Sequence, residues 1–132
     1  MKPMPARASA GPFERVRTAG LALAGVEAAT KYDGSPVLKA GGSFMAGLAM
    51  HPSAEPDTLV VRVHLEERDC LLEDAPETYY LTDYYQRHPV VLVRLTRIDR
   101  DALRDLLTGS WRLALAKGRR RGKPNPAQPV QT

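Results

Sequence analysis

At 132 residues, the chain fits one domain with one hydrophobic core, because two domains of half this length would each bury too little apolar surface. The composition is 43% hydrophobic and 26% charged, and no apolar stretch reaches the roughly 18 to 20 residues of a membrane span. The formal net charge is +4, but five of the 19 Lys and Arg residues fall within residues 117–123, which leaves 14 cations against 15 acids elsewhere. We therefore expect a near-neutral domain with a basic tail and no membrane contact.

Two features of the sequence favour the cytoplasm. Residues 1–12 contain Lys2 and Arg7 but lack the apolar run of a secretory signal, and we expect this segment to be flexible. Cys70 is the single cysteine, so the chain cannot form an internal disulfide or a cysteine-based zinc site. The apolar neighbours of Cys70 favour a buried, inert thiol.

The first helix is expected from Phe13 to Ala24. Pro12 suits the position that opens a helix, because the missing N–H of proline has no helical partner to lose there. Gly25 suits a left-handed residue that closes the helix. Apolar or small side chains recur at helical spacing and predict one buried face, made of Phe13, Val16, Ala19, Gly20 and Leu23.

Four strands are expected next, at residues 29–33, 37–40, 43–50 and 58–65. The pair Gly41-Gly42 predicts a tight hairpin turn between the second and the third of them. Residues 51–57 contain two prolines and are expected to form a loop. The fourth strand alternates in polarity, which predicts one buried face made of Leu59, Val61, Val63 and Leu65.

The second half of the chain predicts further helices and strands. We place a short helix at residues 66–73, an extended segment at 78–82, a turn at 83–88 and a strand at 90–97. The expected buried residues of that strand are Val91, Val93 and Leu95. Asp99 is placed to cap the final helix, which should end at Ala116. The buried stripe of this helix is predicted to consist of Leu103, Leu106, Leu107, Trp111 and Ala114.

Together these elements predict one α+β domain over residues 13–116. Their order is helix, four strands, helix, two strands, helix. Connections of hairpin length between the strands favour a mainly antiparallel sheet with the helices packed on one face. Residues 117–132 are rich in glycine, proline and cations and lack an apolar period, so we expect a disordered basic tail there.

Several strings, in this order and spacing, resemble the MmcQ/YjbR-like family. They are FERVR at 13–17, LALAGV at 21–26, KAGGSF at 39–44, YLTDYY at 80–85, HPVVLVRL at 88–95 and LRDLL at 103–107, followed by Trp111. The resemblance implies a compact α+β fold with an antiparallel sheet, and members are described as DNA-binding through a double-wing-like arrangement of strands and helices. It brings no catalytic residues. The loop at 51–57 and the arginine-rich tail depart from the family pattern.

Two groups of cations are candidates for contact with DNA phosphates. The first belongs to the expected solvent side of the sheet and consists of Lys31, Lys39, Arg62 and Arg94. The alternative for this group is a set of solubilising charges paired with Glu or Asp, which the near balance of charge outside the tail favours. The second group belongs to the tail and consists of Lys117, Arg119, Arg120, Arg121 and Lys123. The alternative for the tail is an incidental basic terminus.

Other chemistry has less support in the sequence. Four tyrosines can stack on unpaired bases, although such rings more often complete a core near a turn; they are Tyr79, Tyr80, Tyr84 and Tyr85. The three histidines lack the spacing of zinc ligands. Glu66 and Glu67 are adjacent and point in different directions, so they do not form a catalytic pair. We therefore expect no metal, no cofactor and no enzymatic activity.

The function that these observations favour is DNA binding without catalysis, mainly through phosphate contacts. A second hypothesis is an interaction or small-ligand-binding domain that uses the tyrosine-rich turn and has no role with nucleic acid. Binding to DNA that weakens steeply with salt would distinguish the first hypothesis from the second.

Overall fold

A computed structural model describes the backbone of residues 4–122 and the side chains of residues 12–117. Its elements follow the chain as α1 (Met4–Leu21), β1 (Val26–Thr30), β2 (Pro36–Ala40), β3 (Ser43–Leu48), β4 (Thr58–Arg62), α2 (Leu65–Asp74), β5 (Tyr79–Tyr80), α3 (Asp83–Gln86), β6 (Val90–Arg94) and α4 (Arg100–Gly122). Within this part of the chain, no helix combines the length and the apolar character that crossing a membrane requires.

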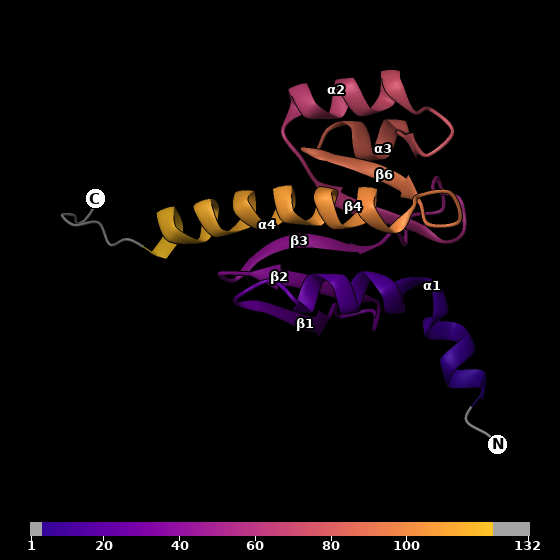
Figure 1. Ribbon diagram of the computed structural model, residues 1–132, viewed down its shortest axis with the longest axis horizontal. Coiled ribbons are helices and arrows are strands. Elements are labelled where there is room, and N and C mark those ends of the chain that lie inside the picture. The colour runs from indigo at the N-terminus through magenta and orange to yellow at the C-terminus, as the bar shows by residue number, and fades with distance from the viewer. Residues whose placement is uncertain (1–3, 123–132) are drawn as a thin grey trace.

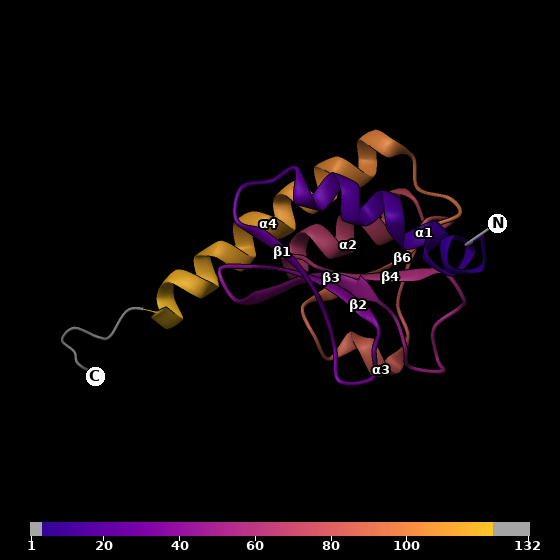
Figure 2. The same ribbon diagram turned by 90° about the horizontal axis from the view of Figure 1, so that it is seen from below.

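The six strands form one antiparallel sheet in the order β1-β2-β3-β4-β6-β5. Figures 1 and 2 show α1, α2 and α4 on one side of this sheet, with α4 lying across it. The predicted α+β fold with a mainly antiparallel sheet is confirmed. One element was not predicted: residues 83–86, expected within a turn, form the short helix α3, which lies on the opposite side of the sheet (Figure 2).

The main core fills the space between the sheet and the three longer helices. It joins Val16 of α1, Leu103 and Leu107 of α4, and the inward side chains of the strands. Arg15 links α1 to the connection between β6 and α4, because its Nη2 donates hydrogen bonds to the carbonyl oxygens of Leu95 and Ile98. The predicted burial of Val91, Val93 and Leu95 is confirmed.

The hairpin between β2 and β3 forms as the sequence predicts. Gly41 and Gly42 both have positive φ angles, 60° and 78°, a conformation that glycine adopts without steric penalty. The register then shifts: Leu38 pairs with Ala46 but Lys39 pairs with Phe44, so Met45 is an extra residue in β3. This bulge turns Met45 into the core, where its carbonyl oxygen accepts a hydrogen bond of 2.9 Å from the buried Ser110 hydroxyl.

Several predicted boundaries differ from the structure. Helix α1 begins at Met4, so Pro12 lies inside it and does not open it. The helix also ends earlier, at Leu21, and Gly25 (φ 76°) then leads directly into β1 at Val26, three residues before the expected strand start. Helix α4 continues to Gly122, past the expected end at Ala116 and through the first part of the expected tail. Residues 123–132 lie outside the described part of the chain.

Five predicted buried side chains are more exposed than expected, and two of them, Ala19 and Leu23, are partly buried against the main core. Leu65 opens α2 instead of ending a strand and is 54% exposed. Cys70 of the same helix is exposed, because α2 keeps no residue fully buried. Trp111 is half-buried against the core, and its indole Nε1 donates a 2.8 Å hydrogen bond to the carbonyl oxygen of Ala24. The rest of the predicted α4 stripe is buried.

Close packing of α1 on β2 at Gly20 predicts a stability difference between two glycine variants. A Cβ at Gly20 would overlap the Cδ1 atom of the fully buried Leu38, whereas a Cβ at Gly109 of α4 would meet open space. Alanine at Gly109, inside α4, gains helix propensity without a clash, whereas alanine at Gly20, next to the last residue of α1, gains less and clashes with Leu38. We therefore expect Gly20→Ala to be less stable than Gly109→Ala by about 1 to 3 kcal/mol. Urea denaturation of the two variants measures this difference, and equal midpoints would contradict the packing described here.

Candidate nucleic-acid interface

The face of the sheet opposite α1, α2 and α4 is only partly covered. Alternation along β4 and β6 turns Val60 and Leu92, which pair directly, toward this face. Tyr85 of α3 packs on them and, together with Val90, completes a second, smaller core. Burial raises the pKa of the Tyr85 phenol, whose oxygen accepts a 3.2 Å hydrogen bond from the backbone N–H of His51. Helix α3 is thereby attached to the open face of the sheet.

A pocket of about 370 Å³ lies beside this second core, and we name it the α3 pocket. Its floor includes Val60 and Val90. The side chains that give the pocket its chemical character are Phe44, Arg62, Tyr84, Tyr85, His88 and Lys117. They come from β3, β4, α3, the residues after α3, and the C-terminal part of α4. Elements far apart in the sequence thus meet at one hollow.

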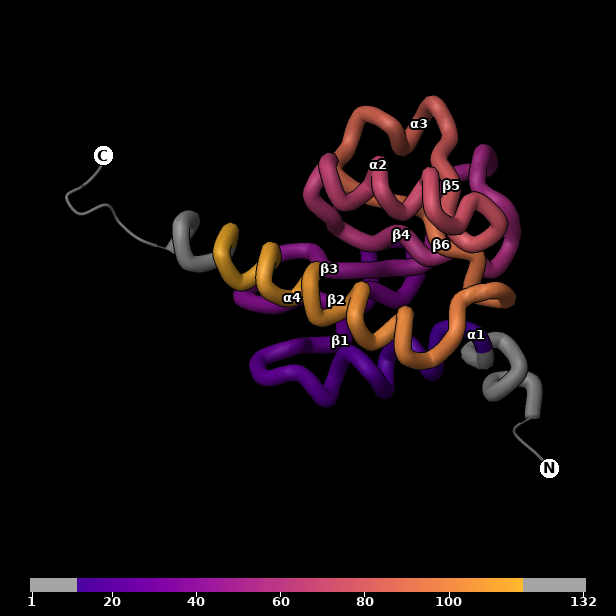
Figure 3. Tube along the Cα trace, turned by 45° about the horizontal axis from the view of Figure 1, so that its top comes forward, coloured from indigo at the N-terminus to yellow at the C-terminus, as the bar shows by residue number. Residues whose placement is uncertain are grey.

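Basic groups line the α3 pocket without an acidic residue among the described residues around it. The Nε atom of Arg62 donates a 2.7 Å hydrogen bond to the carbonyl oxygen of Phe44, which orients the guanidinium group at the pocket. Lys117 lines the same pocket. Helix α4, which carries it, crosses β2 and β3 (Figure 3) and slants past the sheet toward the side of α3 (Figure 2). The pocket therefore suits a ligand with negative charge.

The aromatic part of the pocket is held in place by its neighbours. The Tyr84 ring stacks on the His51 ring with centroids 3.7 Å apart and meets the Tyr85 ring edge-on at 4.9 Å. His51 is itself fixed, since its Nδ1 lies 2.9 Å from the hydroxyl of Ser53, which lies 2.9 Å from that of Thr82. Even so, Tyr84 remains 45% exposed. An aromatic surface is thus presented in a defined orientation.

The four tyrosines have different roles. Tyr79 is buried in the main core, and burial raises its pKa. Tyr85 is buried in the smaller core, and Tyr80 is half-buried beside it. These three follow the prediction that such rings complete a core. Tyr84 is the one of the four whose ring is exposed.

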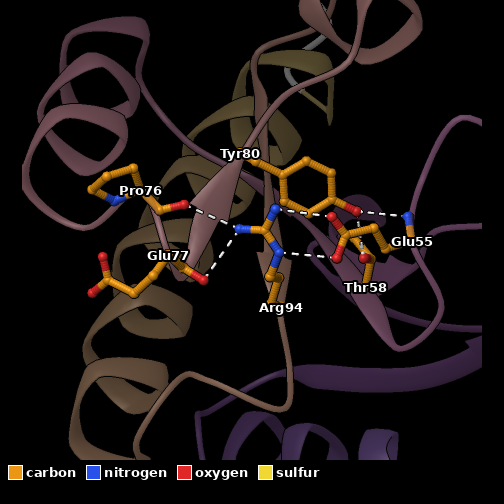
Figure 4. Close-up of polar contacts among 6 residues, drawn as sticks. All are labelled: Glu55, Thr58, Pro76, Glu77, Tyr80 and Arg94. Carbon is orange, nitrogen blue, oxygen red and sulfur yellow. Dashed lines mark hydrogen bonds and ion pairs between the residues drawn. The ribbon is translucent and has the colours of Figure 1, made fainter.

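Arg94 lies on the same face of the sheet but is engaged within the protein. Its Nε and Nη2 atoms each donate a 2.9 Å hydrogen bond to the carboxylate of Glu55, and its Nη1 donates to the carbonyl oxygens of Pro76 and Glu77 (Figure 4). The guanidinium carbon lies 4.3 Å from the centre of the Tyr80 ring. The sequence-based alternative for this cation, a charge paired with Glu, describes what the structure shows.

The Arg94 network also fixes the loop between β3 and β4. The Tyr80 hydroxyl accepts a 2.8 Å hydrogen bond from the Glu55 backbone N–H and lies 2.6 Å from the Thr58 hydroxyl (Figure 4). Hydrogen bonds from Arg94 lower the pKa of the Glu55 carboxyl and raise the pKa of the guanidinium. The proline-bounded loop that departs from the family pattern is therefore attached to β5 and β6.

Lys39 and Lys31 lie outside the α3 pocket. Lys39 is exposed in β2, on the open face beside Phe44 and directly opposite Glu27 of β1. Lys31 is exposed in the loop between β1 and β2, which the Asp33 carboxylate closes by accepting from the N–H and hydroxyl of Ser35. The tail cations Arg119, Arg120, Arg121 and Lys123 have no described side chains. Their segment begins, however, directly after Lys117 of the pocket.

Sequence reasoning did not bring Lys117, Arg62 and Tyr84 together. It ended the last helix at Ala116, which assigned Lys117 to a flexible tail and not to a fixed helix position. The sequence was compatible with a last helix that is one turn longer, because a single glycine such as Gly118 does not by itself end a helix. The stacking of His51 on Tyr84 had no local signal, because the two residues are 33 positions apart in the sequence.

In the part of the chain with described side chains, no cluster of three or more His, Cys, Asp or Glu residues could hold a metal ion.

A family model described as YjbR matches residues 21–113. The chain belongs to the YjbR family. Neither the comparison with curated proteins nor the comparison with solved structures found a match. The YjbR match extends from the end of α1 into α4 and so includes every named residue of the α3 pocket except Lys117. The resemblance noted in the sequence is thereby confirmed at the level of the family.

The ion pair between Glu55 and Arg94 predicts a pH-dependent stability. Because the pKa of Glu55 is lowered from its ordinary value of 4.5, the pair stabilises the fold fully above that pH and progressively less as the pH falls below it. We expect Glu55→Gln to melt below the parent at pH 7 and the gap to close in acid. Thermal melts across the pH range measure this, with Glu14→Gln as the control, because the Glu14–Arg17 pair is exposed and 3.8 Å long. A gap that stays constant with pH would contradict this role of Glu55.

Proposed function

We propose that this YjbR-family protein binds DNA without catalysing a reaction, in the cytoplasm, and that it does so with the open face of the sheet. The observation that carries the proposal is the meeting of Arg62 and Lys117 at one pocket with no acidic residue among its described lining. Cations grouped in this way attract phosphates, which position a protein on DNA without reading its sequence. Lys39 extends the same face on β2.

The position of Lys117 supports a joint role for the fold and the tail. Lys117 lines the pocket, and the chain then continues through Arg119, Arg120, Arg121 and Lys123. Because the tail cations follow Lys117 closely in the sequence, we expect one DNA molecule to contact both groups. The two groups of cations predicted from the sequence become one surface in this proposal.

The proposal assigns Arg94 a structural role. Its guanidinium already donates to the Glu55 carboxylate and to two backbone carbonyls. Moving it onto a phosphate would leave Glu55 without its partner. Among the four sheet cations, Arg62 has the most support because it lines the α3 pocket, and Lys39 and Lys31 would add contacts from β2 and from the loop between β1 and β2.

A second candidate function, a small-ligand-binding domain, is favoured by the same pocket. Its volume of about 370 Å³ falls at the lower end of the roughly 300 to 1,000 Å³ that is usual for ligand sites. An anionic metabolite would find basic and aromatic groups there. The two functions differ in salt dependence, because a small ligand displaces few counterions, whereas DNA releases one for each phosphate that is neutralised.

The salt dependence of DNA binding tests the proposed function. For a 20-base-pair duplex, Arg62→Ala and Lys117→Ala should each weaken binding and flatten the plot of log K against log salt by up to about 0.9. Arg104→Ala is the matched control, because it removes one cation from the helix-covered side, where Arg104 pairs with Asp101. Its slope should equal that of the parent. Absence of duplex binding at low salt, or equal slopes for all three variants, would overturn the proposal.

A further inference from the structure

We propose that the α3 pocket holds one unpaired nucleotide of a bound DNA strand. The inference rests on the proposed function and adds to it the form of DNA that this protein prefers. A nucleotide combines a planar base with a phosphate, and the pocket combines aromatic rings with basic groups. A paired base is stacked inside the duplex and cannot enter a pocket, whereas a base in a single strand or a bulge can.

The size and floor of the pocket suit one nucleotide. A volume of about 370 Å³ admits one small ligand and not a longer segment. Its floor is apolar, formed by Val60 and Val90 over the smaller core. A base that leaves the stack loses contact with its neighbours, and an apolar floor with aromatic walls replaces part of that contact.

The exposure of Tyr84 supports a stacking partner for this ring. Three of the four clustered tyrosines are buried or half-buried, but Tyr84 keeps 45% of its surface exposed although His51 already stacks on it. Holding the ring by His51 and Tyr85 reduces the conformational entropy that binding would otherwise cost. Phe44, from β3, supplies a second aromatic ring in the same pocket.

The basic groups of the pocket would bind the phosphate of the proposed nucleotide. Arg62 of β4, Lys117 of α4 and His88, which follows α3, line the same hollow as Tyr84 and Phe44. The hydrogen bond from Arg62 Nε to Phe44 O links the basic side of the pocket to the aromatic side. An inorganic anion would leave the aromatic rings unused, and an uncharged ring would leave the cations unused. A nucleotide uses both.

The test compares three probes of the same sequence: a paired duplex, the duplex with one bulged thymidine, and the single strand. Parent protein should bind the bulged and single-stranded probes more tightly than the duplex. Tyr84→Leu should lose about 5- to 150-fold in affinity for the two unpaired probes, the range expected for one stacked base, and should bind the duplex normally. Tyr32→Leu is the matched control, because Tyr32 is a fully exposed tyrosine outside the pocket. It should match the parent on all three probes.

Two further variants separate stacking from folding. Tyr84→Trp keeps an aromatic surface and should restore binding to the unpaired probes. If Tyr84→Leu fails to fold, Phe44→Leu replaces it, and the same selective loss is expected. Melting temperatures of all variants confirm that the proteins compared are folded.

The outcomes distinguish this inference from the proposed function. If Tyr84→Leu and Tyr32→Leu bind every probe alike while the duplex retains its dependence on Arg62 and salt, the pocket does not hold a nucleotide, although DNA binding stands. If no probe binds at low salt, both proposals fail together. A competition experiment with free deoxyadenosine monophosphate completes the test. We expect this nucleotide not to displace the bulged probe at micromolar concentration. Displacement at that concentration would assign the pocket to a soluble nucleotide and overturn the inference.

Discussion

The antiparallel pairing of β4 with β6 determines the arrangement of both faces of this protein. The two strands are separated in the sequence by α2, β5 and α3, yet they pair over their full length. Because side chains alternate, Leu59 and Val93 enter the main core beneath the helices, while Val60 and Leu92 form the base of the smaller core beneath α3. A shift of one residue in this register would exchange the two sets and place Arg62 in the main core. The pocket therefore depends on the same register that builds the fold.

The electrostatics of the open face follow from which cations lie near one another. A domain with 14 cations and 15 acids outside residues 117–123 has no overall basic surface, so any attraction for DNA must come from local grouping. The pocket supplies such a grouping because Lys117, in the C-terminal part of the helix α4, and Arg62, a residue of the strand β4, line the same hollow. Net charge alone would have assigned the attraction to the tail.

Much of the fold could be predicted from the sequence, since strong local signals and tertiary packing agree. The Gly41-Gly42 hairpin, the alternation of β6 and the Asp99 cap, whose carboxylate accepts a 2.8 Å hydrogen bond from the Ala102 N–H, all formed as predicted. The end of α4 and the helix α3 did not, because a helix end or a single helical turn is stabilised by only a few interactions and leaves a weak pattern. The candidate site was the least predictable part, because its residues come from elements that are brought together by the packing of strands distant in the sequence.

Arg62 and Arg94 show why a sequence pattern does not by itself assign a site. Each ends its strand, β4 or β6, and alternation places both on the same face of the sheet. The difference between them comes from the loop of residues 51–57, which carries Glu55 to one end of the strand pair and leaves the other end to the pocket. Arg94 therefore stabilises the loop, while Arg62 orients toward a hollow shared with Tyr84 and Lys117. The loop of residues 51–57 thus decides the surroundings of Arg94, and two arginines in equivalent strand positions acquire different neighbours.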